Sequence, residues 1–292
     1  MQIVANNANS EKIPIILAAT PIGNIQDASP RLCEAIMQAD IIAAEDTRKL
    51  LLLTNLLSIK TKAKIISCHE HNEIQRVEKI IQEAQNGKKI LVVSDAGMPT
   101  VSDPGLKIIQ KASELGIKYT VIPGPSAPLT ALVLSAMPTD KFIFEGFLPR
   151  KNGEMEKLLN TLKNETRTTI FFESPKRTKN TIQKMLEILG PDRKIAICRE
   201  LTKIHEEVIR GTLKELAEKK LEILGEVTLV LQGSAKKHEN PEKYLEQINQ
   251  MVENGYKFKQ AVRIVADSTG ISKNKLYNVA LSGKLQEENS DE

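Results

Sequence analysis

A loop of small and acidic residues follows the most apolar strand-like run of this chain. Residues 90–93 read Ile-Leu-Val-Val, and residues 94–105 contain two glycines, two prolines and two aspartates. Buried parallel strands read as such continuous apolar runs, and ligands of α/β sheets bind beyond the carboxyl ends of the strands. The loop contains neither G-x-G-x-x-G nor G-x-x-x-x-G-K-[ST], the two sequences that cradle phosphates. We therefore predict that it holds a polar organic cofactor without a phosphate-binding loop.

Four further clusters of chemically capable residues follow other expected strands. They are Thr20-Pro21, Glu45 to Arg48, His69 to Glu73 and Pro123 to Ala127. Loops after parallel strands share one edge of a sheet, so these clusters are expected to converge on one cleft. Each cluster alone is more typical of a capped helix start, and their occurrence together favours a site.

The candidate catalytic residues are Glu45, Asp46, Arg48 and His71. Asp46 and Arg48 are spaced either for a salt bridge that shapes the loop or for a substrate clamp. His71, with His69, suits a general base or a phosphate contact near neutral pH, and a solvated helix start is the alternative. Because His-x-His alone is a weak metal motif, no metal is expected.

The elements that must position these residues alternate between strands and helices. Strands are expected at 14–19, 41–44, 64–67, 90–93, 119–122 and 141–147, with helices at 30–39, 73–85 and 106–115 between them. The first five strands predict a doubly wound α/β domain. More closely spaced strands, with more antiparallel character, are expected in a second α/β unit, at 168–172, 194–198, 206–211 and 226–232.

The composition divides the chain into five segments. We expect a disordered lead-in over residues 1–12, α/β domains over 13–149 and 150–234, a helical unit over 241–285, and an acidic tail over 286–292. Helices expected at 242–254, 258–267 and 273–281, with a short turn at 268–272, are typical of a helix-turn-helix. Such a unit either packs on the body or a partner subunit or binds nucleic acid. Polar groups such as Lys273 and Lys275 on the last helix favour nucleic acid.

Bulk composition narrows the class of protein. The 292 residues carry a net charge of +4, and only 3% are aromatic, so a binding surface built mainly from aromatic rings is not expected. Three widely separated cysteines favour a reducing compartment. The sequence contains neither a run of about 18 apolar residues nor a secretory signal, so we expect a cytoplasmic protein with no membrane span.

Nine short segments, in order along the chain, carry a family resemblance. They are Ala19–Asn24, Ala44–Arg48, His69–Glu73, Ser94–Pro99, Ser102–Gly105, Pro123–Ala127, Glu145–Pro149, Phe172–Arg177 and Arg199–Lys203. Together they resemble the tetrapyrrole methylase-like methyltransferases and, within them, the branch called ribosomal RNA small subunit methyltransferase I. The resemblance covers residues 13 to 233, and the helical tail is similar to that family's C-terminal helix-turn-helix.

The resemblance implies two α/β domains of the tetrapyrrole methylase type with S-adenosylmethionine in the cleft between them, usually in a homodimer. It implies methyl transfer to the ribose 2′-hydroxyl of a cytidine in the decoding region of 16S rRNA, as free RNA or in an assembled small subunit. The implied cofactor site consists of Pro21, Asp95, Ala96, Gly97, Met98, Ser126, Ala127, Phe172 and Thr228. We expect Asp95 to position the cofactor and not to accept a proton.

RNA phosphates are expected to meet basic side chains of the second domain and of the helical tail. These are Arg150, Lys151, Lys176, Arg177, Lys273 and Lys275. Two alternatives remain open: a methyltransferase acting on a tetrapyrrole, and a helix-turn-helix regulator whose α/β body senses a ligand. The basic tail and the loops at 45–48 and 69–73 argue against the first, and methyl transfer to rRNA would exclude the second.

Overall fold

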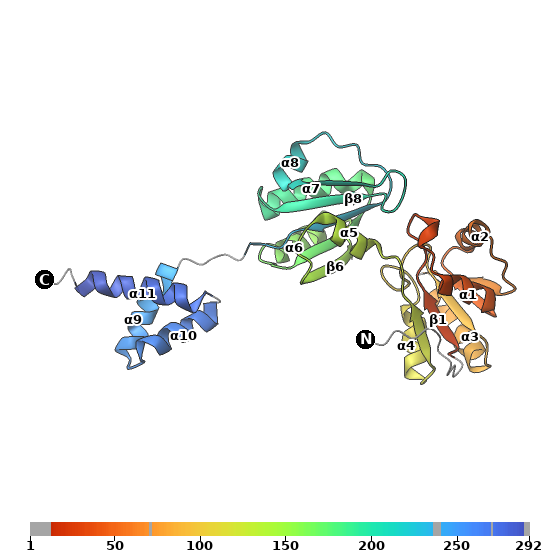
Figure 1. Ribbon diagram of the computed structural model, residues 1–292, viewed down its shortest axis with the longest axis horizontal. Coiled ribbons are helices and arrows are strands. Elements are labelled where there is room, and N and C mark those ends of the chain that lie inside the picture. Colours follow the sequence, from red (N-terminus) through yellow and green to blue (C-terminus); the bar gives the residue numbers. More distant parts are fainter. Residues whose placement is uncertain (1–12, 70–71, 236–240, 270, 289–292) are drawn as a thin grey trace. The chain divides into compact units, whose positions relative to one another are not determined.

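The computed structural model describes residues 13–69, 72–235, 241–269 and 271–288, with side chains as far as residue 282 (Figure 1). The chain forms two compact units, one ending at Gly233 and the other beginning at Ser234. The expected lead-in, most of the linker and the end of the acidic tail lie outside the described residues.

The first sheet of the larger unit has five parallel strands. They are β1 (Ile15–Ala18), β2 (Ile41–Ala44), β3 (Lys64–Ser67), β4 (Ile90–Val93) and β5 (Tyr119–Ile122). Their spatial order is β3-β2-β4-β1-β5, and every pairing is parallel. Every residue of β2 and β4 is buried. This burial explains why their sequences are continuous apolar runs instead of alternating patterns.

Helices cover both faces of this sheet, which confirms the doubly wound architecture. On one face lie α1 (Pro30–Gln38) and α2 (Thr47–Leu56), and on the other lie α3 (Glu73–Gln85) and α4 (Leu106–Glu114). Successive strand residues point to opposite faces, so Ile41 packs with α3 and α4 while Ile42 packs with α1 and α2. A short 3-10 helix, η1 (Ile25–Asp27), precedes α1.

The second sheet is mixed. Its strands are β6 (Phe142–Phe147), β7 (Thr168–Glu173), β8 (Lys194–Arg199), β9 (Glu207–Thr212) and β10 (Val227–Leu231), in the order β6-β7-β10-β8-β9. Only β6 and β7 are parallel, and the other pairings are antiparallel. The expected boundary after residue 149 placed 141–147 in the first domain. Because β6 pairs with β7, the division between the two sheets falls before β6.

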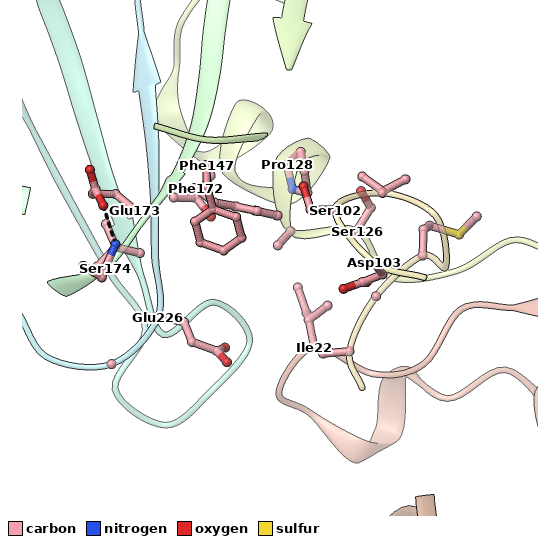
Figure 2. A pocket seen from close by; sticks show the side chains of 18 of the residues that line it. Ile22, Ser102, Asp103, Ser126, Pro128, Phe147, Phe172, Glu173, Ser174 and Glu226 are labelled. Atoms are coloured by element: carbon pink, nitrogen blue, oxygen red, sulfur yellow. Dashed lines mark hydrogen bonds between the residues drawn. The ribbon is translucent and has the colours of Figure 1, made fainter. Parts of the chain in front are cut away.

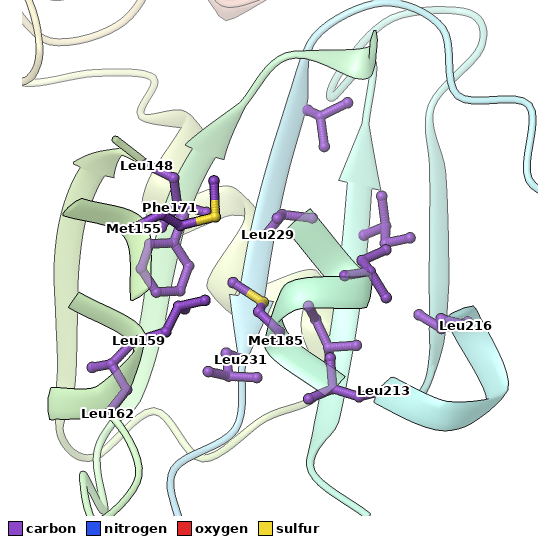
Figure 3. Close-up of a cluster of buried hydrophobic side chains, with 14 residues drawn as sticks. Leu148, Met155, Leu159, Leu162, Phe171, Met185, Leu213, Leu216, Leu229 and Leu231 are labelled. Carbon is purple, nitrogen blue, oxygen red and sulfur yellow. The ribbon is translucent and has the colours of Figure 1, made fainter. Parts of the chain in front are cut away.

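Helices also cover both faces of the second sheet. On one face α6 (Asn152–Thr161), α7 (Pro175–Leu189) and α8 (Leu213–Glu218) enclose a core that contains Phe171, Met155 and Leu229 (Figure 3). On the other face lies α5 (Ala127–Ser135), whose Ala131 and Leu132 pack against Ile170 and Val230. Helix α5 therefore follows the last strand of the first sheet in sequence but contributes to the core of the second.

The smaller unit is helical. It contains η2 (Pro241–Tyr244), α9 (Leu245–Glu253), α10 (Phe258–Thr269) and α11 (Lys273–Glu288). Ile248, Val262 and Leu276 form its core with neighbouring apolar residues, and the rings of Phe258 and Tyr277 lie 5.4 Å apart. Across the described ranges of the chain, no helix is long and apolar enough to cross a membrane.

Candidate functional site

A pocket of about 350 Å³ lies where the loops of the first sheet meet the end of β7 and the start of β10. This is a volume in the range of small-molecule sites. Figure 2 shows Ile22, Asp103 and Ser126 on one side, facing Phe172 and Glu226 on the other. The lining residues are Ile22, Ala96, Gly97, Met98, Val101, Ser102, Asp103, Ser126, Ala127, Pro128, Phe147, Phe172, Glu173, Ser174, Pro175, Gly225, Glu226, Val227 and Thr228.

The first wall is built from loops at the carboxyl ends of β1, β4 and β5. Thr20 and Gly97 exchange two backbone hydrogen bonds of 3.0 Å, which join the β1 loop to the β4 loop. Gly97 has a φ of +82°, a backbone conformation that residues with a Cβ atom rarely adopt. This junction places Ile22 beside Ala96 and Met98 in the pocket.

The second wall is built from the paired strands β7 and β10. Phe172 lies directly opposite Thr228 in the sheet register, and both line the pocket. The Phe172 ring lies 5.0 Å from that of Phe144 and 5.3 Å from that of Phe147, which also lines the pocket. These ring contacts restrain Phe172 as an apolar surface for a bound ligand.

A small ion-pair network holds the turn before β10. Glu200 Oε1 accepts from the Glu226 N–H at 2.9 Å and from Lys203 Nζ at 2.9 Å. Lys203 Nζ also lies 3.0 Å from Glu226 Oε2. This network positions Gly225 and Glu226 at the edge of the pocket.

Three carboxylates line the pocket, while the described lining residues include no lysine or arginine. Asp103 lies in the loop before α4, and burial, reinforced by the negative charge of Glu45, raises its pKa to about 7. Glu173 is 3% exposed, and Glu226 has a side chain that is 77% exposed. Such a lining suits a neutral or cationic organic ligand and gives no cradle for a phosphate.

Comparisons with known proteins agree over nearly the whole chain. Residues 14–217 match the family described as Tetrapyrrole (Corrin/Porphyrin) Methylases. The ribosomal RNA small subunit methyltransferase I of Mycobacterium tuberculosis is 42% identical over 274 residues, which are 93% of this chain and 96% of the relative. The protein of that name from Bacillus subtilis is 38% identical over 281 residues, 93% of this chain and 95% of the relative. The chain belongs to the ribosomal RNA small subunit methyltransferase I branch of the tetrapyrrole methylase family.

Solved structures of other tetrapyrrole methylase-like proteins share the fold. The methyltransferase CobJ superposes with a TM-score of 0.57 at 18% identity, covering 76% of this chain and 94% of that one. Uroporphyrin-III C-methyltransferase from Thermus thermophilus, complexed with S-adenyl homocysteine, has a TM-score of 0.53 at 15% identity, covering 75% and 96%. At these identities the likeness concerns the fold alone.

The structure brings together most of the cofactor residues that the methylase resemblance implies. Ala96, Gly97, Met98, Ser126, Ala127, Phe172 and Thr228 all line the pocket. Pro21 and Asp95 are not among the lining residues. Pro21 precedes Ile22, which lines the pocket in its place. The role of each residue in binding stays a prediction.

Asp95 of this methylase fold connects β4 to the start of α2. Its N–H donates to Glu45 Oε2 at 3.1 Å, and its Oδ1 accepts from the Asp46 N–H at 2.9 Å. Lys49 Nζ lies 2.8 Å from Asp95 Oδ2, and this contact raises the pKa of Lys49. The carboxylate is thereby directed at the N-terminus of α2, where an anion is favoured.

Three of the candidate catalytic residues, Glu45, Asp46 and Arg48, are described by the structure, and none of them lines the pocket. Asp46 caps α2 and pairs with Arg48, whose Nη2 lies 2.7 Å from Asp46 Oδ2. These hydrogen bonds hold the pKa of Asp46 well below its usual range. The Asp46–Arg48 pair is the loop-shaping salt bridge that the sequence offered as one interpretation. Burial raises the pKa of Glu45, although its carboxylate accepts from Asp95. His71 lies outside the described residues.

Asp103, Glu173 and Phe147 line the pocket but were not singled out as site residues from the sequence. The motif that contains Asp103, Ser102 to Gly105, was visible and could have pointed to it. Glu173 and Phe147 likewise lie in motifs that carry the resemblance, Phe172–Arg177 and Glu145–Pro149. Among the residues that the structure describes, no three His, Cys, Asp or Glu side chains gather as metal ligands.

The basic residues expected to contact RNA differ in exposure and in whether their side chains already have partners. Arg150, Lys176, Lys273 and Lys275 are exposed, and Lys151 is exposed but lies 3.1 Å from Glu154 Oε1. The Arg177 guanidinium donates to the carbonyls of Leu148 and Pro149, so it braces the loop after β6. To contact RNA as predicted, the Arg177 guanidinium would have to exchange hydrogen bonds to these carbonyls for bonds to phosphate.

Proposed function

We propose that the protein is an S-adenosylmethionine-dependent methyltransferase of small-subunit ribosomal RNA, and that its target is the ribose 2′-hydroxyl of a cytidine in the decoding region. The observation that carries this proposal is the 42% identity to a ribosomal RNA small subunit methyltransferase I over 93% of this chain and 96% of that relative. The enzymes known to act on tetrapyrroles share only the fold, at 14–18% identity. They do not favour a tetrapyrrole substrate.

The pocket fits S-adenosylmethionine by its chemistry. That cofactor carries an ammonium and a sulfonium cation and no phosphate. The pocket has three lining carboxylates, and its described lining contains no lysine or arginine. The backbone of Ala96 and Gly97 and the apolar surfaces of Met98, Ala127 and Phe172 would hold the rest of the cofactor.

When bound, S-adenosylmethionine supplies an electrophilic methyl group. The chain itself must hold the ribose hydroxyl in line with that methyl group and exclude water. Phe147 and Phe172 give the pocket an apolar wall, and exposed Arg150 and Lys176 are available for RNA phosphates. The homodimer implied by the family resemblance stays a prediction.

The test uses purified protein, S-adenosylmethionine with a labelled methyl group, and small ribosomal subunits that lack the modification. Free 16S rRNA serves as a second substrate, which separates action on RNA from action on the assembled subunit. We expect label at one cytidine of the decoding region and resistance of the following phosphodiester to alkali, because cleavage there needs a free 2′-hydroxyl. Label on a base, or no label in either RNA, would contradict the proposal.

A further inference from the structure

The three carboxylates of the pocket differ in whether they are free to take a proton. Glu173 Oε1 accepts from the Ser174 N–H at 2.8 Å, and Oε2 accepts from the Thr181 hydroxyl at 2.7 Å. Arg177 Nε adds an ion pair at 3.5 Å. Both oxygens of Glu173 therefore hold the start of α7. Glu226 is paired with Lys203 and is mostly in solvent.

Asp103 is the third carboxylate, and it is half-buried. Figure 2 shows its carboxylate pointing into the pocket, toward the wall that carries Phe172 and Glu226. The Ser94 side chain hydrogen-bonds to it, and the charged groups that act on it are Glu45 after β2, Asp95 after β4 and Lys49 on α2. Two of these three neighbours are anionic, and Lys49 already pairs with Asp95.

The loop that carries Asp103 is held at its C-terminal end. Glu73, which is 5% exposed, accepts from the N–H groups of Gly105 at 2.9 Å and Lys107 at 3.0 Å. Thr100 and Ser102 have φ values of +74° and +66°, in the left-handed region that such residues seldom adopt. Backbone strain of this kind persists only where surrounding contacts enforce it, and it is common at functional sites.

We propose that Asp103 is the catalytic base of methyl transfer, a role that rests on the function proposed above. The hydroxyl oxygen forms its bond to the donated methyl carbon while the carbon–sulfur bond breaks, leaving its electron pair on sulfur. The hydroxyl proton passes to a carboxylate oxygen of Asp103 and is later released to solvent. Charge balances, because the sulfonium becomes a neutral thioether and the aspartate becomes a neutral acid.

The environment of Asp103 matches this task. Burial and the charge of Glu45 raise the pKa of Asp103 to about 7. A general base is most effective when its pKa lies near the pH of the reaction, here near neutral. The base must be ionised at the start of the step. The methylation rate should therefore rise as pH increases through about 7 and level off above it.

The experiment compares wild type, Asp103→Asn and the surface control Asp192→Asn in the full-length protein. Asp192 is exposed and lies outside the pocket lining, so its variant carries the same chemical change without touching the site. Single-turnover methylation of small-subunit RNA is measured from pH 5.5 to 9. Cofactor affinity is measured by calorimetry, and the pKa of Asp103 is measured in wild type by NMR of ¹³C-labelled aspartate.

We expect Asp103→Asn to lower the methylation rate by about 10²- to 10⁴-fold and to abolish the rise in rate near neutral pH. The NMR titration should show one aspartate near pH 7 that is missing from Asp103→Asn and present in Asp192→Asn. Cofactor affinity should fall far less than the rate, since the role assigned is proton acceptance.

Three results would overturn this role. The first is an Asp103→Asn protein that keeps its rate and its pH profile. The second is an Asp103→Asn protein that loses cofactor affinity in proportion to its rate, which would make Asp103 a binding residue. In the third, wild type transfers no methyl group to RNA even though Asp103 titrates near pH 7. That outcome would reject the proposed function and the catalytic role with it, whereas the first two reject the role alone.

Discussion

The backbone N–H of Asn24 donates a 3.0 Å hydrogen bond to the hydroxyl of Thr202, which is 178 positions away along the chain. Asn24 follows the first strand of the first sheet, and Thr202 lies in the turn after β8 of the second. Beside them, a Cβ built on Gly23 would lie 2.8 Å from the Leu201 carbonyl oxygen and 2.6 Å from Thr202 Oγ1. The loops that carry the two walls of the pocket therefore touch, backbone to backbone, at Gly23.

Replacing Gly23 with alanine should destabilise the protein and weaken cofactor binding. The Leu201 carbonyl is backbone and cannot move without shifting the turn, so the overpacking should lower the free energy of unfolding by about 1–3 kcal/mol. Urea unfolding and calorimetric titration with S-adenosylmethionine measure the two effects.

The matched control is Gly153→Ala in α6, where a new Cβ would meet no atom within 4 Å. That variant should bind the cofactor normally and be as stable as wild type or more stable, by up to about 1 kcal/mol, because alanine favours a helix. Equal behaviour of the two variants would show that the contact at Gly23 is not tight.

Truncating Phe172 to alanine should weaken cofactor binding about 10- to 100-fold. A phenyl ring that covers a ligand contributes about 1.5–3 kcal/mol of apolar burial, which converts to that factor in Kd. Phe142→Ala is the control, because Phe142 belongs to the edge strand β6, is 42% exposed and does not line the pocket. A Phe172→Ala protein with an unchanged Kd would place the cofactor elsewhere.

Removing the Glu73 carboxylate should loosen the loop that carries Asp103. Glu73→Ala leaves two N–H groups, those of Gly105 and Lys107, without their acceptor at the start of α4. We expect the free energy of unfolding to fall by about 1–3 kcal/mol, measured by urea titration. Glu73→Gln keeps one acceptor oxygen and should lose less. Glu78 is exposed on the same helix, so Glu78→Ala should leave the free energy of unfolding nearly unchanged. If Glu78→Ala lowers it as much as Glu73→Ala does, the two hydrogen bonds of Glu73 are not the cause.

Reversing the charge of Lys273 and Lys275 together should weaken RNA binding without changing cofactor affinity. Both side chains are exposed on α11, and the buried core residue of this segment is the next one, Leu276, so the substitutions leave packing intact. Each lost phosphate contact lowers the slope of log affinity against log salt by about 0.7–0.9, and filter binding at several salt concentrations measures it.

The control for this pair is Lys219→Glu with Lys220→Glu, which changes net charge equally at exposed positions after α8. If both double variants weaken binding alike, overall charge and not the helical unit attracts the RNA.

The sequence by itself determined the elements and the family. Continuous apolar runs such as Ile90–Val93 are typical of central parallel strands, and their alternation with helices predicted the doubly wound sheet. The ordered motifs indicate the methylase family. The clusters after all five strands of the first sheet are expected to converge on one cleft, and of these the loops after β1, β4 and β5 line the pocket. Local sequence patterns suffice to predict strands, helices and motifs, because each of these depends mainly on residues a few positions away along the chain.

Tertiary structure alone decided which residues face the pocket. Strand β6 has the pattern of a sixth strand in the first domain, yet it pairs with β7, because strand pairing depends on partners far along the chain. Asp95 has the position of a cofactor ligand, but its carboxylate turns to the N-terminus of α2. Asp103 lines the pocket from a loop whose end, at Gly105, is held by the distant side chain of Glu73. Side-chain direction and burial arise from such long-range packing, and they determine which of several similar acids is free to take a proton.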